Sequence, residues 1–190
     1  MTPQHYLVAQ AYNNAWANHR LLKACGQLSA EELAAQRTGF FPSIIHTLNH
    51  ILTVDWLYIS ALEGECIGRA AFEPEIPFPA FADLDREQRA ADRRLIDLCR
   101  NLGETGLATE VRIPRSTHIQ VETADRTLLH LFQHQIHHRG QVHAMLSGTS
   151  VAPPQLDEFF TADPAEQALR RQDFAELGFT EALIWETDHA

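Results

Sequence analysis

Histidine spacing is the feature of this sequence that most clearly indicates chemistry. His134 and His138 lie four positions apart, and so do His46 and His50. Residues four apart lie one above the other on a helix, close enough for two imidazoles to bind one metal ion. A single helix does not easily close a coordination sphere, so we expect an imidazole from a facing helix to complete a three-histidine set. Three neutral imidazoles suit zinc or nickel and leave a position for water or a substrate.

The chain contains eleven histidines, and most of them need another explanation. A lone His-x-x-x-His pair arises easily by chance and more often reflects exposed or hydrogen-bonded histidines. His130 and His143 are interpreted equally well as exposed or core-edge residues. His137 lies about 100° around the helix from His138, so one of the two is expected to have a structural or supporting role. Four further histidines require no metal, namely His5, His19, His118 and His189.

Four segments with a hydrophobic period of 3.6 residues can position these side chains. They span about residues 3–26, 43–64, 83–101 and 123–148, with Ser43 as the expected N-cap of the second. Four such helices predict an all-α four-helix bundle. Residues 1–150 are expected to form the bundle, and residues 151–190 a C-terminal extension packed on it with one more surface helix at 164–177, which includes Arg170.

The connections between the helices are predicted to be long. Pro74, Pro77 and Pro79 force an extended crossover between residues 64 and 83. Two briefly alternating segments, 111–113 and 119–121, predict short strands or extended arms between the third and fourth helices.

Charged residues on the helices offer no clear general base. The run from Arg86 to Arg94, which includes Asp92, is interpreted as a solvated helix face. Asp55 and Glu63 do not share a single stripe with His50, and we interpret them as exposed or capping carboxylates.

Composition limits the class of protein. The 190 residues suit one domain, and 25 acidic against 15 basic side chains give a net charge of -10. That balance disfavours a nucleic-acid partner, which normally requires a basic face. The three cysteines are far apart, as in a protein of a reducing compartment. Neither a signal peptide nor a convincing membrane span is apparent, so the prediction is a soluble cytoplasmic protein without a membrane partner.

Three segments together carry a family resemblance. They are Tyr12-Asn-Asn-Ala-Trp-Ala-Asn18, Leu48-Asn-His-Ile-Leu-Thr-Val-Asp-Trp56 and His134-Gln-Ile-His-His-Arg-Gly-Gln-Val-His143. In this order they resemble the DinB family of the DinB/YfiT-like metalloenzymes. The resemblance implies a four-helix bundle with long crossover connections, often a homodimer. It also implies a divalent metal held by His50, His134 and His138, whereas His46 lies one turn before the family's ligand position.

Three neighbours of the implied ligands are assigned roles on chemical grounds. Gly140 costs about 1 kcal/mol of helix propensity relative to alanine, which suggests that close helix packing or backbone approach requires it. Gln141 and Asn49 are interpreted either as hydrogen-bond partners of ligands or as capping and packing residues.

The resemblance suggests an enzymatic function, beside which two alternatives stay open. Members of the wider superfamily resemble metal-dependent transferases or isomerases that use a low-molecular-weight thiol such as bacillithiol or mycothiol. The metal would lower the pKa of a bound thiol or water, which predicts a thiol S-transferase or a hydrolase acting on a small thiol or electrophile. The alternatives are a non-catalytic metal-binding stress-response protein and a metal-free bundle for protein association. Zinc and nickel are favoured, and manganese and iron also fit.

Overall fold

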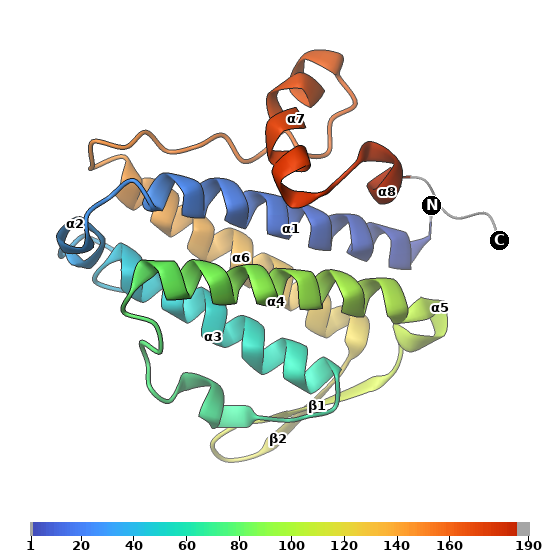
Figure 1. The fold of residues 1–190 in the computed structure, drawn as a ribbon. Coiled ribbons are helices and arrows are strands. Elements are labelled where there is room, and N and C mark those ends of the chain that lie inside the picture. The colour runs from blue at the N-terminus through green and yellow to red at the C-terminus, as the bar shows by residue number, and fades with distance from the viewer. Residues whose placement is uncertain (1, 186–190) are drawn as a thin grey trace.

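Four long helices form the body of the protein, whose computed structural model describes residues 2–185 (Figure 1). They are α1 (Pro3–Cys25), α3 (Ile44–Leu62), α4 (Phe81–Asn101) and α6 (Ala124–Leu146). Both α1 and α3 pack against α4 and α6, so each long helix has two neighbours. The predicted helical fold is confirmed, and the only strands among the described residues form one small hairpin.

Local capping explains where two of these helices begin. The hydroxyl of Thr2 accepts a hydrogen bond from the backbone N–H of His5 at 3.2 Å, and Pro3 occupies the first turn. The Ser43 hydroxyl accepts from the backbone N–H of His46 at 3.3 Å, as expected for an N-cap. Because this cap fixes where α3 begins, it also fixes how far along the helix His50 lies.

Short elements connect the long helices. They are α2 (Ala30–Ala34), the 3-10 helix η1 (Gly68–Phe72), α5 (Gly103–Gly106), and an antiparallel hairpin of β1 (Glu110–Pro114) and β2 (Ile119–Thr123). The hairpin lies where arms were expected, at the start of α6. The connection after α3 is not wholly extended, because η1 precedes the proline-rich part.

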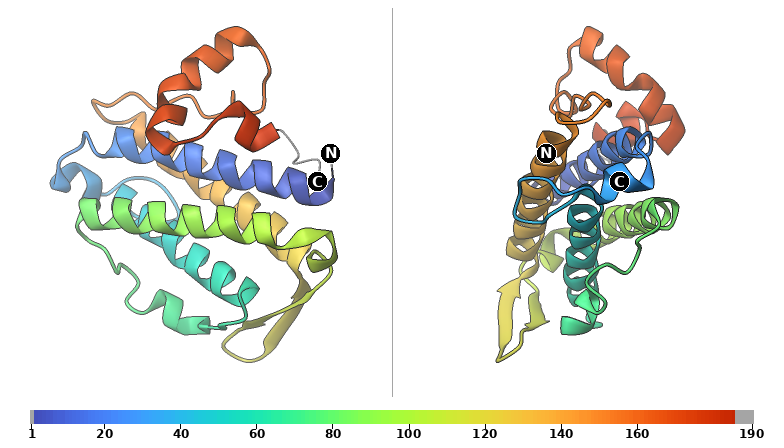
Figure 2. Two further views of the ribbon diagram at one scale, coloured as in Figure 1. Left: turned by 45° about the vertical axis from the view of Figure 1, so that its right-hand side comes forward. Right: turned by 90° about the vertical axis from the view of Figure 1, so that its left-hand side faces the viewer.

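The C-terminal part of the described chain lies along the outer side of α1 (Figure 2). It consists of α7 (Pro164–Leu177) and α8 (Glu181–Trp185). The expectation of a purely surface role for Arg170 is wrong, because its side chain is 1% exposed and donates to Glu181 and to the carbonyl of Glu158. A domain division at residue 150 stays a prediction, and His189 lies outside the described residues.

The core is mainly apolar, with Trp16, Leu52 and Leu128 fully buried. A band of polar side chains nevertheless crosses it, drawn from all four long helices. No helix in residues 2–185 combines the length and the apolar character needed to cross a membrane.

Candidate metal centre

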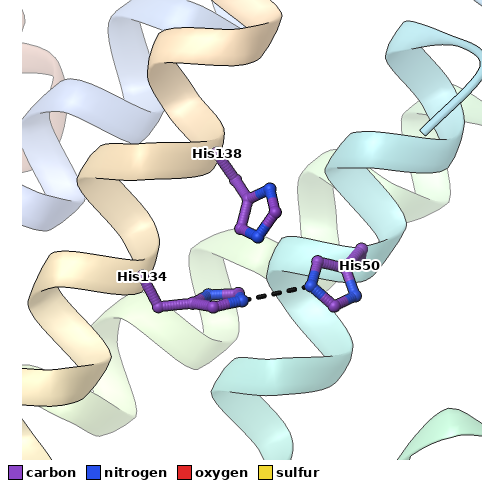
Figure 3. A group of neighbouring side chains, drawn as sticks. All are labelled: His50, His134 and His138. Carbon is purple, nitrogen blue, oxygen red and sulfur yellow. Dashed lines mark hydrogen bonds between the residues drawn. The ribbon is translucent and has the colours of Figure 1, made fainter. Parts of the chain in front are cut away.

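Three histidines converge between α3 and α6 (Figure 3). One ring nitrogen from each of His50, His134 and His138 lies within 4.8 Å of the others. The Nε2 atoms of His50 and His134 are 3.1 Å apart, and the ring centroids of His134 and His138 are 4.4 Å apart. The structure therefore brings together the three side chains singled out from the sequence. His46 does not join them, because its Nε2 lies 2.9 Å from a carboxylate oxygen of Glu75.

Burial keeps these three imidazoles neutral. Desolvation, with the neighbouring histidines adding to it, lowers the pKa of His50 to about 4 and that of His134 to about 3. The pKa of His138 is also lowered, again chiefly by burial. Near neutral pH the rings carry no charge, so their lone pairs are available to a cation without displacing a proton.

Gln141 orients one of the rings. Its Oε1 lies 2.8 Å from Nδ1 of His138, and its Nε2 lies 3.1 Å from Nε2 of His137. An amide oxygen only accepts, so Nδ1 of His138 carries the proton and its Nε2 keeps the lone pair. Of the two roles considered for Gln141, the structure shows the hydrogen-bonding one. His134 differs, because its buried Nδ1 has no hydrogen-bond partner in the described chain.

The spacing of the nitrogens fits a metal ion. Two nitrogens that each lie ~2.0–2.1 Å from one tetrahedral ion are about 3.3 Å apart, close to the 3.1 Å between His50 and His134. Within residues 2–185 the group contains three such ligands and no fourth histidine, cysteine or carboxylate. A structural zinc site is normally closed by four protein ligands, whereas a catalytic one leaves a position open.

Phe41 covers one side of the cluster. Its ring centroid lies 4.3 Å from that of His50, 4.8 Å from His46 and 5.7 Å from His138. The Phe41 side chain is buried, whereas His50 and His134 keep part of their surface accessible. Nothing in the sequence singles out Phe41, because it lies in an irregular segment before α3.

A buried polar network lies behind the histidines. Asp55 of α3 and Asp92 of α4 are 1% and 5% exposed, so both expectations of exposed carboxylates are wrong. Gln88 Nε2 donates to both, at 2.7 Å and 3.3 Å. Burial raises the pKa of each carboxyl to about 7, and the charge of Asp55 adds to the shift at Asp92. Glu63 is the C-cap residue of α3, one of the two roles expected for it, and its side chain also pairs with Arg94.

Arg139 carries the positive charge of this network, and side-chain amides link it to the carboxylates. Its Nη1 donates to the side-chain oxygens of Asn14, Asn18 and Gln135. The same three amides donate through nitrogen, Asn14 and Asn18 to Asp92 and Gln135 to Asp55. Each amide thus bridges the guanidinium and a carboxylate. The segment that contains Asn14 and Asn18 was recognised only by resemblance, and only the fold shows what those residues contact.

A second group of metal-ligand type joins α1 to α7. The Nε2 of His19 lies 2.9 Å from Glu176 and 3.7 Å from Asp173. Arg89 donates to the Nδ1 of His19 at 2.8 Å, and Arg20 donates to Asp173 at 2.6 Å. Burial, aided by the charge of Arg89, lowers the pKa of His19. Both ring nitrogens of His19 have hydrogen-bond partners, and cations neutralise the two carboxylates. We therefore interpret this group as structural contacts that join α7 to α1.

The remaining candidates have other roles. Asn49 donates to the carbonyl of Phe78 and accepts from its N–H, both at 2.9 Å, so it fixes the crossover segment against α3. His143 lies 3.0 Å from the carbonyl of Pro154, and the ring of His130 packs edge-on against Tyr58. The packing expected for Gly140 is wrong, because a Cβ there would meet no atom of residues 2–185 within 4 Å beyond its own helix backbone.

Known proteins are similar to this chain in sequence or in fold. The "Uncharacterized protein YizA" of Bacillus subtilis (strain 168) is 26% identical over 132 residues, which cover 68% of this chain and 79% of that protein. "Protein DinB" of the same organism is 26% identical over 170 residues, covering 82% of this chain and 94% of that one. The crystal structure of a DinB-like protein from Bacillus cereus matches with a TM-score of 0.58 at 17% identity, over 74% of this chain and 90% of its own, which shows a shared fold.

The family model provides the broadest match. The model of the DinB family aligns with residues 3–173, which include all four long helices and most of α7. The resemblance drawn from the three sequence segments is thereby confirmed, and the chain belongs to the DinB family.

Proposed function

We propose that His50, His134 and His138 bind one divalent metal ion. The observation that carries this proposal is the convergence of three imidazole nitrogens within 4.8 Å of one another, from two helices whose packing holds them there. Their lowered pKa values and the hydrogen bond from His138 to Gln141 support it, since both leave lone pairs free. Three imidazoles favour zinc or nickel, with manganese and iron as further candidates.

We further propose that the ion has a catalytic role. Three protein ligands leave a coordination position open, and the partly accessible surfaces of His50 and His134 let a small molecule reach it. When bound, the metal would lower the pKa of a coordinated thiol or water and supply a thiolate or hydroxide near neutral pH. Phe41 excludes water from one side, which strengthens electrostatic interactions in the site.

The proposed reaction is transfer of a small thiol to an electrophile. The thiol releases its proton to solvent, its sulfur forms a bond to an electrophilic carbon, and the leaving group departs with the bonding electron pair. Hydrolysis by the corresponding hydroxide is the close variant of this chemistry. The chain's own contribution is to hold three neutral ligands in place and to keep one side of the site apolar.

Metal analysis of purified protein tests the site. Wild type is expected to bind one equivalent of zinc or nickel, and His134→Ala and His138→Ala are expected to lose it. His118→Ala is the matched control, because His118 is exposed near the hairpin turn, away from the three ligands. Metal content that is unchanged in both α6 variants would show that the ion, if bound, lies elsewhere.

Turnover separates the catalytic role from simple metal binding. Metal-loaded protein is incubated with a panel of thiols and electrophiles, and conjugation is measured with and without chelator. Metal-dependent conjugation that His134→Ala abolishes supports a transferase. Stoichiometric metal without conjugation or hydrolysis would favour a non-catalytic metal-binding protein.

A further inference from the structure

A polar cavity opens close to the proposed metal centre. Its volume is about 370 Å³, and it lies between α3, the β-hairpin and the first turns of α6. The lining side chains are Tyr58, Ile113, Arg115, Gln120, Glu122, Arg126, Thr127 and His130. The proposed metal site does not include this cavity.

Arg115 is held in the cavity with donors to spare. Its Nε donates to Oε1 of Gln120 and its Nη2 to the hydroxyl of Tyr58, both at 2.9 Å. These bonds fix the plane of the guanidinium. An arginine has five N–H donors, and in the described part of the chain the remaining side-chain donors of Arg115 have no acceptor. A planar group with unpaired N–H donors matches the two oxygens of a carboxylate or phosphate.

The one carboxylate in the cavity does not compete for Arg115. Glu122 accepts a hydrogen bond from Gln120 at 3.1 Å and pairs with Arg126 at 3.5 Å. The lining therefore carries two arginines against one glutamate, whereas the whole chain has a net charge of -10. A locally positive cavity on an acidic protein attracts anions selectively.

Tyr58 and His130 connect this cavity to the three histidines. The ring of His130 lies 5.2 Å from that of Tyr58 and 6.5 Å from that of His134, measured between centroids. His130 precedes His134 by one helical turn, about 6 Å along α6. The cavity lining therefore ends one helical turn before His134, and a molecule that bound both Arg115 and the metal position would span this turn.

We propose that this cavity binds the anionic end of the molecule whose thiol reaches the metal. The substrate class is an elongated thiol that carries a carboxylate or phosphate, with Arg115 as the principal contact and Tyr58 as its positioning residue. This inference rests on the proposed function for the thiol end only, because anion binding by Arg115 requires no metal.

Matched thiols measure the effect in cobalt-loaded protein, where thiolate binding gives a charge-transfer band. The probes are 6-mercaptohexanoate, 6-mercaptohexyl phosphate and the uncharged 6-mercaptohexan-1-ol. At least one anionic thiol is expected to bind about tenfold more tightly than the alcohol, and comparison of the two identifies the preferred oxyanion. Arg115→Gln should remove that preference without changing binding of the alcohol. Equal affinity for all three probes in wild type would overturn the inference.

Two further variants separate a specific contact from general effects. Arg112→Gln, in the same hairpin but outside the cavity lining, removes the same charge and should keep the preference. Tyr58→Phe keeps the charge of Arg115 but loses its orienting hydroxyl, and should reduce the preference about threefold. An equal loss of the preference for the anionic thiol in Arg112→Gln and Arg115→Gln would overturn the inference, because net charge alone would then explain the preference.

A metal-free arm distinguishes the two proposals. Hexanoate and inorganic phosphate are titrated into chelator-treated protein while the guanidinium Nε–H resonance of Arg115 is followed by NMR. A saturable shift with either anion supports the cavity even if the protein binds no metal. No shift with either would overturn anion binding by Arg115, whatever the metal analysis shows.

Discussion

Asp92→Asn should make the protein more stable at pH 8 and leave its stability nearly unchanged at pH 4. The side chain of Asp92 is buried, and its Oδ1 accepts all three hydrogen bonds that the structure shows for it. An asparagine oxygen in the same place can accept these bonds. The substitution therefore removes a buried charge, and its repulsion by Asp55, and keeps the acceptor in use, because the amide nitrogen takes the place of Oδ2, which accepts no hydrogen bond within the described residues.

The sign and the size of this change in stability follow from the pKa of Asp92. Burial raises that pKa from 3.8 to about 7, so the folded state binds more protons than the unfolded state between these values. The contribution of Asp92 to the stability of wild type is therefore fully present below about pH 4, falls as pH rises toward 7, and is constant above it. At ~1.4 kcal/mol per pKa unit the cost is at most about 4 kcal/mol. Structural relaxation lowers it, so we expect the variant to gain ~1–3 kcal/mol at pH 8.

Urea denaturation at pH 4 to 8, with chelator present, measures this difference. The lowered pKa values of His50 and His134 make stability fall as pH decreases, but they act in both proteins and cancel in the comparison. Asp97→Asn, at an exposed position on α4, is the matched control. If Asp92→Asn instead loses stability and the loss grows with pH, Asp92 is ionised and stabilised by Arg139, and the reasoning is refuted.

Three other outcomes are expected. Gln141→Leu removes the acceptor that orients His138 and should weaken zinc binding 10–100-fold in a chelator competition, whereas His118→Ala should not. Because the pKa values of His50 and His134 are about 4 and 3, neither should gain a proton between pH 7 and pH 5, and only His138 can compete with the metal there; zinc affinity should therefore fall by at most about tenfold per pH unit, and a fall of about a hundredfold per unit would contradict the neutrality of His50 and His134. Arg170→Ala removes a buried cation that joins α7 to Glu181. It should lower the free energy of unfolding in urea by about 3 kcal/mol and expose residues after 150 to proteolysis. Resistance to proteolysis equal to that of wild type would show that Arg170 does not hold α7.

The sequence predicted the helices and the pair His134 and His138 because both follow from local rules. Hydrophobic period, caps and prolines set where the helices begin and end, and a spacing of four places His134 and His138 on one face. Spacing alone could not choose between His46 and His50, since that choice depends on which turn of α3 faces α6. The family resemblance indicated His50, and the structure places His46 against Glu75 instead.

The buried network could not be predicted in the same way. Asp92 lies within a charged run of α4 and looks solvated by composition, but the rotation of α4 turns it inward to Asn14 and Asn18 of α1. These two asparagines lie more than seventy positions away in the chain, so no local pattern reports the contact. Gly140 illustrates the opposite error, because a residue that is unusual in a helix suggested packing that the described chain does not contain.

The network and the histidine cluster are linked by their order on α6. His134 is followed by Gln135, and His138 by Arg139, so two stripes run along the helix about 100° apart. Gln135 and Arg139 are fixed by hydrogen bonds to Asp55, Asn14 and Asn18, which sets the rotation of α6 about its axis. With that rotation set, the histidine stripe faces α3 and His50. The bonds that anchor Gln135 and Arg139 therefore also orient His134 and His138, although the network contains none of the three proposed ligands.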